Sequence, residues 1–467
     1  MPAKRDLNSL SPLDGRYADK TSALTRCMGD AALTRYRALV ECRYLLKLCS
    51  TPGVKIRRLK PSEKALLQKL PDLSAAEVAL IYAIETTGAG GRPPTRHDVK
   101  AVEYFLKSRL EGTSLRDITE FVHFGLTSED VNNLSYALML RDALRSVLLP
   151  ALEEVMKAVD ALARRHAAAP LLARTHGQPA VPTTFGKEFR VFHARLSRQY
   201  VQLYKARVCA KLNGAAGNYN AHCAAFPGAD WRRFSREFIE SFNSGTGPGL
   251  EYNPFTTQIE PHDSYAEVFD ALRRANTVLV AFCQDMWRYI SAELIVQRAV
   301  AGEVGSSTMP QKVNPIHFEN AEGNLGLANA MFTFFSSKLP VSRLQRDLSD
   351  STVERNFGAA FGHCLVAYKA VMTGLSRVSV GEDAARRELK AHPEVVAEGL
   401  QTILRREKAA EPYERLSKLT RGRRVTAGDL AGFIDGLKLK PSVKAELKRL
   451  SPLTYTGLAG KLASGRR

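Results

Sequence analysis

The most regular pattern in the chain is a stripe of apolar residues through residues 264–294. Its members recur at alternating steps of four and three residues: Val268, Leu272, Ala275, Leu279, Phe282, Met286 and Tyr289. This spacing places them along one side of a helix, as in a coiled-coil seam. The pattern therefore predicts a helix that is longer than most helices of globular proteins.

Similar stripes predict four more long helices. In residues 131–163 the stripe contains Leu148, Leu152, Val155, Val159 and Leu162, and in residues 184–210 it contains Phe185, Phe189, Phe192, Leu196, Tyr200 and Leu203; residues 318–338 and 352–379 are further helical segments. Pro150 lies inside the first of these segments, where proline favours a kink. Alternating patterns typical of strands are scarce. Long amphipathic helices bury their stripes against one another, so we expect an all-α fold with a long central helix bundle shared between subunits.

The lengths of the expected helices and the positions of Pro and Gly between them predict three domains. Residues 1–125 consist of shorter segments joined by Pro/Gly loops and are expected to form an N-terminal helical domain. Residues 126–370 carry the long helices. Residues 371–467 form a basic C-terminal domain of shorter helices, interrupted by three X-Pro pairs at His392-Pro393, Glu411-Pro412 and Lys440-Pro441.

Composition limits the class of protein. The chain has 467 residues, of which 45% are hydrophobic and 25% are charged, as in an ordinary globular protein. We find no apolar run long enough to span a membrane and no secretory signal at the N-terminus. The seven cysteines are scattered, without C-x-x-C pairs or zinc-ligand spacing. We therefore expect reduced thiols, a cytoplasmic location, and no metal or cofactor.

The charge is strongly positive, and it is unevenly distributed. The formal net charge is +19, and residues 371–467 hold 20 Lys and Arg against 11 Asp and Glu. A basic surface fits nucleic acid, anionic membranes or anionic small substrates, and it can equally be a solvated face without a specific partner. The charge alone does not choose among these.

Polar clusters that break helices interrupt the long apolar stripes. They contain Arg16-Tyr17, Arg96-His97-Asp98, His123, Thr127-Ser128, His176, Gln258, residues 305–315 and residues 346–355. Taken singly, each has a structural explanation: Thr127-Ser128 suits a helix N-cap, His123 a core histidine, and Ser306-Ser307 a linker. Taken together, they match a known pattern.

Residues 305–315, GSSTMPQKVNP, resemble the G-S-S-x-M-P-x-K-x-N signature of the fumarase/aspartase superfamily. Its members release fumarate from a succinyl compound by breaking a C–N or C–O bond. Four further segments, SPLDGRY, HFGLTSEDVNNLSYALML, RTHGQPAVPTTFGKE and NPFTTQIEPHD, are similar to the bacterial-type branch of the adenylosuccinate lyase family. The resemblance extends from about residue 9 to about residue 460.

The resemblance implies a fold, an assembly and a reaction. It implies an all-α homotetramer whose active sites combine several subunits. The reaction is β-elimination of fumarate from adenylosuccinate, giving AMP, and from SAICAR, giving AICAR, in purine nucleotide biosynthesis. Another lyase of the superfamily, of the argininosuccinate lyase or fumarase type, is the alternative enzyme. The substrates of those enzymes lack phosphate, so the phosphate-binding candidates Arg346, Ser351 and Arg355 argue against it.

Two other classes of protein remain to be weighed. A nucleic-acid-binding protein would explain the positive charge, but the sequence has no recognised module that reads nucleic acid. A purely structural helix bundle would not need the polar loops.

The resemblance also assigns roles to residues. It implies that Ser306 is the base, on a glycine-flanked loop that closes as a lid over substrate, and that His176 is the general acid, paired with Glu319. His97 would assist His176 or orient the phosphate, and His123 would bind substrate. The succinyl carboxylates would be held by Thr127, Ser128, Gln258, Lys312, Asn314 and Asn320. Phosphate or ribose would be held by Arg16, Tyr17, Arg346, Ser351 and Arg355.

The sequence departs from the family pattern near His97. Arg96 stands where the family has asparagine, and the GAGGRPP stretch before it looks like an insertion. Arg96 and Asp98 are nevertheless retained as substrate-binding candidates. Arg346 and Ser351 lie where the chain is expected to enter a helix, whose N-terminus would add backbone donors.

Overall fold

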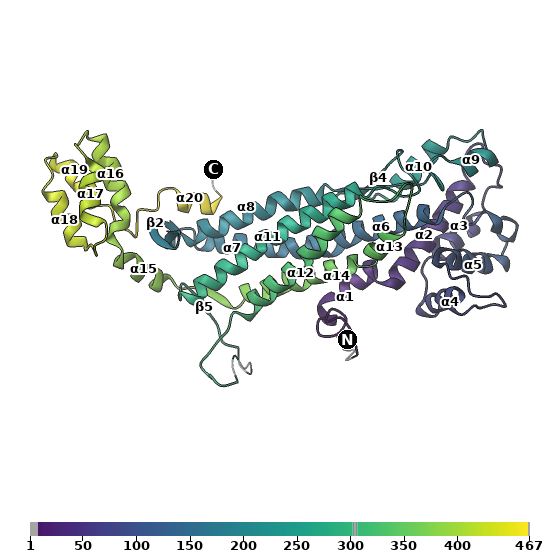
Figure 1. The fold of residues 1–467 in the computed structure, drawn as a ribbon, viewed down its shortest axis with the longest axis horizontal. Helices are drawn as coiled ribbons and strands as arrows, with labels where there is room; N and C mark the ends of the chain where they lie inside the picture. The colour runs from purple at the N-terminus through teal and green to yellow at the C-terminus, as the bar shows by residue number, and fades with distance from the viewer. Residues whose placement is uncertain (1–7, 301, 303–304, 306, 466–467) are drawn as a thin grey trace. The chain divides into compact units, whose positions relative to one another are not determined.

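The computed structural model describes residues 8–300, 302, 305 and 307–465 (Figure 1). Its contacts divide the chain into two compact units. Unit 1 contains Met1–Leu152, Gln199–Thr277 and Gly323–Lys369, and unit 2 contains Glu153–Arg198, Val278–Glu322 and Ala370–Arg467. The boundaries fall inside five helices, which are α7 (Leu149–Arg165), α8 (Phe185–Tyr204), α11 (Asp263–Ser291), α12 (Ile316–Lys338) and α14 (Phe357–Leu375). The predicted division into three domains stays a prediction.

Unit 1 contains the shorter helices of the N-terminal region and of the middle of the chain. They are α1 (Ala18–Met28), α2 (Asp30–Leu48), α3 (Pro61–Lys69), α4 (Ala75–Thr86), α5 (Asp98–Glu111), the 3₁₀ helix η1 (Arg116–Phe121), α6 (Ser128–Ala143), the π-helical turn η2 (Leu144–Leu148), α9 (Asn220–Ala225), α10 (Trp231–Glu240) and α13 (Ser349–Glu354). Strands β3 (Arg207–Ala210) and β4 (Gly249–Tyr252) pair in parallel. Helix α2 contacts α3, α4, α5 and α6, so it lies at the centre of this group.

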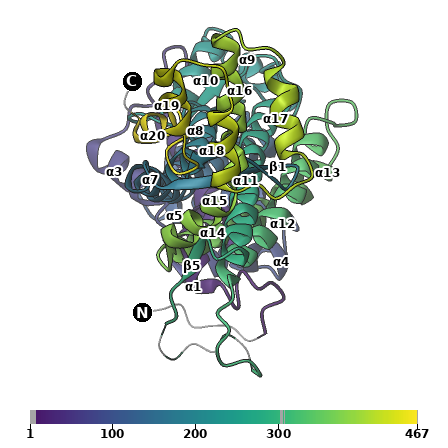
Figure 2. The same cartoon turned by 90° about the vertical axis from the view of Figure 1, so that its left-hand side faces the viewer.

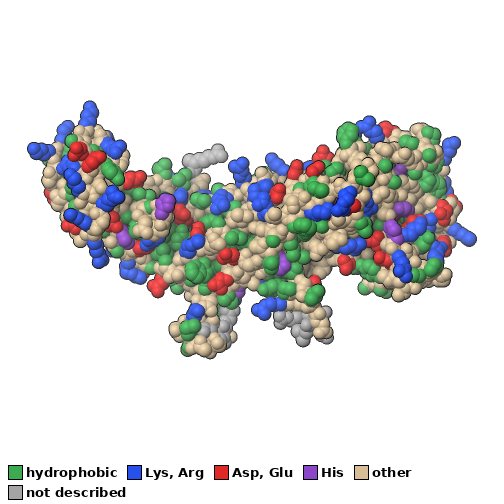
Figure 3. Space-filling view, viewed as in Figure 1, with side chains coloured by type: hydrophobic (Ala, Val, Ile, Leu, Met, Phe, Trp, Pro, Cys, Tyr) green, Lys and Arg blue, Asp and Glu red, His purple; other side chains and the backbone are tan. Residues whose placement is uncertain are grey.

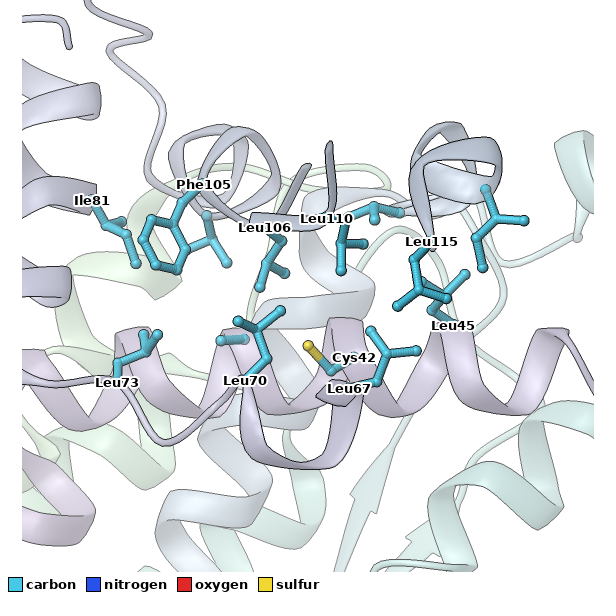
Figure 4. Close-up of a cluster of buried hydrophobic side chains, with 14 of the residues drawn as sticks. Cys42, Leu45, Leu67, Leu70, Leu73, Ile81, Phe105, Leu106, Leu110 and Leu115 are labelled. Atoms are coloured by element: carbon cyan, nitrogen blue, oxygen red, sulfur yellow. The ribbon is translucent and has the colours of Figure 1, made fainter. Parts of the chain in front are cut away.

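A buried apolar cluster fixes α5 against α2 (Figure 4). Phe105, Leu106 and Leu110 of α5 face Cys42 and Leu45 of α2, and all five are almost completely buried. Burial of this kind contributes roughly 1.5–3 kcal/mol for each large apolar side chain. Because His97 and Asp98 lie at the N-terminal end of α5, this cluster also fixes the position of two candidate site residues.

Unit 2 contains two antiparallel strand pairs and the C-terminal helices. Strand β1 (Pro170–Thr175) pairs with β2 (Gln178–Thr184), and β5 (Ile295–Gln297) pairs with β6 (Val378–Val380). The helices are α15 (Glu382–Ala391), η3 (Pro393–Val396), α16 (Ala397–Arg406), α17 (Pro412–Thr420), α18 (Ala427–Asp435), α19 (Pro441–Lys448) and α20 (Ala459–Ser464). Helices α16 to α19 surround their own apolar core (Figure 2). Lys and Arg side chains are spread over the outside of these helices (Figure 3).

The long helices are confirmed, and the expected helical fold is confirmed as a mostly helical one. In α11 the predicted stripe is buried from Val268 to Met286, and Tyr289 is half-buried. The helix predicted for residues 184–210 ends at Tyr204, because residues 207–210 form β3. The fold is therefore mostly helical, with three short strand pairs. Such strands are three to seven residues long, too short to show an alternating pattern in the sequence.

Pro150 coincides with a local change in helix geometry. The π-helical turn η2 ends at Leu148, and Pro150 is the second residue of α7. Proline has no N–H to donate to the preceding turn, and a π-helical turn accommodates such a break without ending the helix. In the described part of the chain, no helix combines the length and the apolar character needed to cross a lipid bilayer.

Candidate active site

The Thr127-Ser128 segment begins α6 and is tied to a neighbouring loop. Thr127 is the N-cap, and its backbone N–H donates to Asp130 Oδ2 at 2.9 Å. Asp130 Oδ1 also accepts from Lys211 Nζ at 2.6 Å, and both of these side chains are fully buried. The backbone N–H groups of Asn213 and Gly214 donate to the same carboxylate. The helix-cap explanation of this segment is therefore correct, and the cap also leaves Ser128 at the start of α6, only partly buried.

His97 and Ser128 lie together. His97 Nε2 is 3.3 Å from Ser128 Oγ, while the backbone N–H of Lys100 donates to His97 Nδ1 at 3.3 Å. Since Nδ1 accepts this bond, the ring proton lies on Nε2, which can donate to Ser128 or to a ligand. The imidazole is about half exposed, so a ligand can reach it.

Asp98 joins two arginines beside this pair. Its Oδ2 accepts from Arg37 Nη2 at 2.7 Å and from Arg355 Nη2 at 3.0 Å. Burial tends to raise the pKa of Asp98, but Arg37 and Arg355 outweigh burial and lower it. Asp98 is therefore a carboxylate that holds Arg355 in place. A contact of Asp98 with a substrate anion would be repulsive, and its role in substrate binding stays a prediction.

Gln258 and Arg346 form a second group in unit 1. Arg346 Nη1 donates to Gln258 Oε1 at 3.2 Å, and Arg346 Nη2 lies 3.2 Å from Glu129 Oε2. Gln258 Nε2 donates to the carbonyl of Ala215 at 3.3 Å. Glu129 follows Ser128 directly, so Arg346 and Ser128 are held near the same end of α6.

His123 is held by a carboxylate that the sequence argument did not identify. Its Nδ1 lies 2.5 Å from Glu41 Oε1, and its backbone N–H donates to Glu41 Oε2 at 3.1 Å. Burial tends to lower the pKa of His123, but Glu41 outweighs burial and raises it. The backbone of His123 has φ +61°, an unusual value that this bidentate contact stabilises.

Of the four other candidates of unit 1, two are exposed and two, Tyr17 and Ser351, are half-buried. Arg16 and Arg96 are exposed, and Tyr17 is the N-cap of α1 with Lys20 Nζ 5.6 Å from its ring centre. A cavity of about 320 Å³ is lined by Asp14 and Arg355, which places the segment containing Arg16 close to the Asp98–Arg355 pair. The fourth candidate, Ser351, lies within α13.

Two of the expected donors at the helix after Arg346 are already used. The backbone N–H of Ser349 donates to Asp347 Oδ1 at 2.8 Å, and that of Ser351 donates to Asp350 Oδ1 at 2.6 Å. Helix α13 is also only six residues long, which limits its dipole. Two backbone donors of this helix N-terminus are therefore already used, and the expectation that it adds donors for phosphate stays a prediction.

In unit 2, His176 lies at the tip of the β1–β2 hairpin, where we expected a loop between helices. Thr175 pairs with Gln178, so His176 and Gly177 are the two turn residues, with φ +53° and +75°. Two positive φ values in succession are typical of the type I′ turn, which glycine favours. Arg174 Nη1 donates to the Gly177 carbonyl at 3.2 Å and also pairs with Glu388 of α15. The turn is therefore braced, and its imidazole is exposed.

The signature loop also belongs to unit 2. The predicted base, Ser306, lies outside the described residues. Asn314 Nδ2 donates to the Gly305 carbonyl at 2.6 Å, which closes the loop across its base. A Cβ atom at position 305 would lie 1.9 Å from the Lys312 carbonyl oxygen, so this position requires glycine. Lys312 is exposed and lines a cavity of about 360 Å³.

Glu319 and Asn320 are in the first turns of α12. Glu319 Oε1 accepts from Trp287 Nε1 at 3.1 Å. Within the described residues of a single chain, no hydrogen bond or ion pair joins Glu319 to His176, so that pairing stays a prediction. The structure thus brings together His97, Asp98, Ser128 and Arg355, and separately Gln258 with Arg346.

The residues that sequence reasoning missed are mostly buried charges. Arg37, Glu41, Glu129 and Lys211 are each 4% exposed or less, and each contacts a candidate residue or its cap. The sequence does contain a signal for such residues: a charged residue among apolar ones in a helix, such as Glu41 in RALVECRYLL. Charged residues are rarely buried unless they are paired, so this pattern indicates a buried partner.

Comparison with known proteins identifies the family. A family model described as "Lyase" matches residues 75–331, and one described as "Adenylosuccinate lyase C-terminal" matches residues 342–456. The adenylosuccinate lyase of Haemophilus influenzae is 47% identical over 459 residues, covering 98% of each chain. The chain belongs to the adenylosuccinate lyase family. Members of this family from Escherichia coli and Dictyostelium discoideum are 47% and 43% identical, with 97% of each chain covered in both cases.

Solved structures agree with membership of the adenylosuccinate lyase family at the level of fold. A fumarate lyase from Mesorhizobium sp. BNC1 superposes with a TM-score of 0.69 at 18% identity, covering 96% of this chain and 98% of that one. A 3-carboxy-cis,cis-muconate lactonizing enzyme from Pseudomonas putida gives the same TM-score at 21% identity, covering 95% and 96%. The chain has the fumarate lyase fold and, as a member of this family, is an enzyme of the lyase class.

Proposed function

We propose that this protein cleaves adenylosuccinate to AMP and fumarate, and SAICAR to AICAR and fumarate. The observation that carries this proposal is the 47% identity to bacterial adenylosuccinate lyases along 98% of the chain. The signature loop and the arginines of unit 1 support it, because the reaction needs both a fumarate-releasing site and an anion-binding site.

The reaction requires a base, an acid and stabilisation of a carbanion. Ser306 is proposed as the base that removes the proton from the carbon next to a carboxylate, on the evidence of the signature alone. His176 is proposed as the acid that protonates the departing nitrogen. Its exposed imidazole on a braced turn suits that role, because a proton donor must be held in place and yet meet the substrate.

The succinyl group is proposed to bind at the start of α6 and at the signature loop. Ser128 Oγ and His97 Nε2 lie 3.3 Å apart at the N-terminus of a 16-residue helix, and this end of a helix favours a carboxylate. Thr127 and Gln258 of unit 1 would also donate hydrogen bonds to the succinyl carboxylates. Lys312 and Asn314 of the signature loop and Asn320 of α12 would do the same. Lys312 would supply the positive charge that the dianionic carbanion needs.

The phosphate and ribose are proposed to bind to the arginines of unit 1. Arg346 is fixed by Glu129 and Gln258, and Arg355 is fixed by Asp98, so both guanidinium groups are held before substrate arrives. Arginine suits this role because its planar group contacts two oxygens of an oxyanion at once. Arg16, Tyr17 and Ser351 would complete the site, and Arg96 and His123 would contact substrate at its edge.

The enzyme is proposed to work as a homotetramer with sites shared between subunits. Helix α12 exposes Leu327 and Phe334, seven residues apart and each more than half exposed. Such a stripe on a long helix suits burial against a second copy of the chain. Sharing would also bring the exposed groups of unit 2 to the arginines of unit 1 of another subunit.

Direct assay of the purified protein tests this function. Adenylosuccinate is mixed with the enzyme, and the ultraviolet spectrum is followed for AMP and fumarate, with argininosuccinate and malate as comparison substrates. Turnover of adenylosuccinate alone is the expected result. Turnover of argininosuccinate or malate, with none of adenylosuccinate, would replace the proposal by another fumarate-releasing reaction.

A further inference from the structure

A cluster of buried ionisable side chains lies next to Arg346. It comes from three segments of unit 1 and contains Glu129, Glu260, His262, Asp350 and Glu354, each 4% exposed or less. We refer to these five residues as the buried cluster. None of them was predicted as a site residue, although Glu129 follows Ser128 and Asp350 precedes Ser351 in the sequence.

The buried cluster contacts Arg346 at one end and contains a histidine at the other. Arg346 Nη2 is 3.2 Å from Glu129 Oε2, and His262 Nε2 is 3.3 Å from Glu354 Oε1. Glu260 Oε2 accepts the backbone N–H of His262 at 2.7 Å. The buried cluster therefore places four carboxyl groups beside one imidazole and Arg346, of which only Arg346 is always charged.

Several polar atoms in this region lack partners. Six of them are buried without a hydrogen-bond partner among the residues that the structure describes: Glu129 Oε1, Asp350 Oδ2, Arg346 Nε, Glu354 Oε1 and both ring nitrogens of His262. The His262–Glu354 contact is therefore a charge contact at 3.3 Å without hydrogen-bond geometry. Buried polar atoms are satisfied in most native structures, and exceptions call for an explanation. The free Nε and the shared carboxylates show that Arg346 is not fully used by the protein itself.

The protonation state of His262 sets the net charge of the buried cluster. Burial would lower the pKa of His262, but Glu354, Glu260 and Glu129 outweigh burial and raise it to about 9. Burial, followed by Glu354, raises the pKa of Glu129 well above its ordinary value. The titratable groups that act on His262 are Glu129 of α6, Glu260 before α11 and Glu354 of α13, and Tyr265 of α11 packs against its ring. Arg346, Asp350 and Tyr136 act in turn on Glu129 or Glu354.

We propose that His262 is a positioning residue that keeps Arg346 available for the anionic substrate. As an imidazolium, His262 offsets the charge of Glu354. The imidazolium reduces by one the negative charge around Arg346, which then retains more positive potential for a phosphate. When His262 is neutral, the charge of Glu354 is no longer offset. The additional negative charge then lowers the positive potential at Arg346. The inference rests on the proposed function, because it takes Arg346 as a group that binds phosphate.

The backbone at His262 guides the choice of variant. Its φ is +65°, and its ring packs edge-on against Tyr265 with the ring centres 5.1 Å apart. Asparagine tolerates positive φ better than most residues and carries no charge, so His262→Asn removes the imidazolium with little backbone strain. His363→Asn is the matched control, because His363 is also buried in unit 1 but pairs with Asn324 instead of a carboxylate.

Binding of AMP, measured by titration calorimetry from pH 7.5 to pH 10, tests the proposal. His262→Asn is expected to bind AMP roughly five-fold or more weakly than wild type at pH 7.5, the effect of one lost charge near Arg346. In wild type and His363→Asn the affinity falls as pH rises through about 9, where His262 loses its proton. In His262→Asn the fall near pH 9 is absent, and only a separate fall near pH 8 remains, where Glu129, whose pKa is raised to about 8, loses its proton beside Arg346.

If charge balance explains the effect of His262→Asn, a second substitution should restore AMP binding. Glu354→Gln removes the carboxylate that the imidazolium offsets, so the double variant His262→Asn with Glu354→Gln should recover most of the AMP affinity. Loss of packing alone would not be rescued by this second change. Glu354→Gln by itself should bind AMP at least as tightly as wild type, with the fall in affinity shifted to lower pH because His262 has lost its main anionic partner.

Each outcome decides the inference. Wild-type affinity in a folded His262→Asn, or no rescue in the double variant, overturns it; if His262→Asn does not fold, the pH shift in Glu354→Gln decides instead. Wild-type enzyme that fails to cleave adenylosuccinate but binds AMP with the expected pH dependence overturns the proposed function alone. Wild-type enzyme that cleaves adenylosuccinate with no effect of His262 on AMP affinity overturns this inference alone.

Discussion

The two units prepare their candidate site residues in different ways. In unit 1, Arg346 and Arg355 are each fixed by a carboxylate, and Asp98 is shared by two arginines. In unit 2, His176 and Lys312 are exposed, the first on a turn and the second on a closed loop. The difference teaches that the candidate residues of unit 1 are fixed by ion pairs within the protein, whereas those of unit 2 are presented to solvent on a turn and a loop.

The largest effect is expected from loss of the proton-transfer groups. Ser306→Ala and His176→Ala should each reduce kcat by roughly 100-fold or more, the usual contribution of an acid or base. The assay is steady-state turnover of adenylosuccinate, with circular dichroism and sedimentation to show that fold and assembly are retained. Mixing the two variants under subunit exchange should restore some activity. No recovery after verified exchange would reject sites shared between subunits.

The next effect is expected at the base of the signature loop. Gly305→Ala places a Cβ atom against the Lys312 carbonyl, so the loop must shift, and kcat should fall by about ten-fold or more. Gly432→Ala is the matched control, because a Cβ there meets nothing within 4 Å and alanine favours the surrounding helix, α18. Equal turnover of the two variants would show that the loop geometry does not matter for catalysis.

A smaller effect, confined to binding, is expected for Arg346→Ala. KM for adenylosuccinate should rise about ten-fold, while kcat changes much less, because the phosphate lies away from the reacting bond. Arg343→Ala is the control in the same loop, where Arg343 is 84% exposed and pairs with Asp347. A fall in kcat with an unchanged KM would place Arg346 in the chemistry instead.

The smallest effect on turnover is expected at the His123–Glu41 pair, where stability changes instead. The pKa of His123 is raised in the folded state, so the pair stabilises the fold fully below the ordinary histidine pKa of about 6.5 and loses this contribution as pH rises through the raised value. Glu41→Gln should lower the unfolding free energy by roughly 3–5 kcal/mol at pH 6. Urea unfolding of wild type and Glu41→Gln at pH 6 and pH 9 measures this difference in unfolding free energy. An equal difference at the two pH values would contradict the ion pair.

The sequence predicted the long helices because their stripes repeat over many turns, as α11 shows from Val268 to Met286. It missed the β1–β2 hairpin, because the turn signal His176-Gly177 depends on backbone angles that either a loop or a hairpin could adopt. The candidate residues came from motifs, and motifs do not reveal partners. Glu41, Arg37 and His262 are distant in sequence from the residues they hold, so only the fold brings them together.

The most direct test of the comparison between the two units is equilibrium binding of adenylosuccinate to variants that cannot cleave it. Ser306→Ala should bind with a Kd close to the wild-type KM, and Ser306→Ala with Arg346→Ala should bind about ten-fold more weakly. This result would separate the chemistry of unit 2 from the binding of unit 1. Equal affinities for the two variants, or loss of binding in Ser306→Ala alone, would contradict that separation.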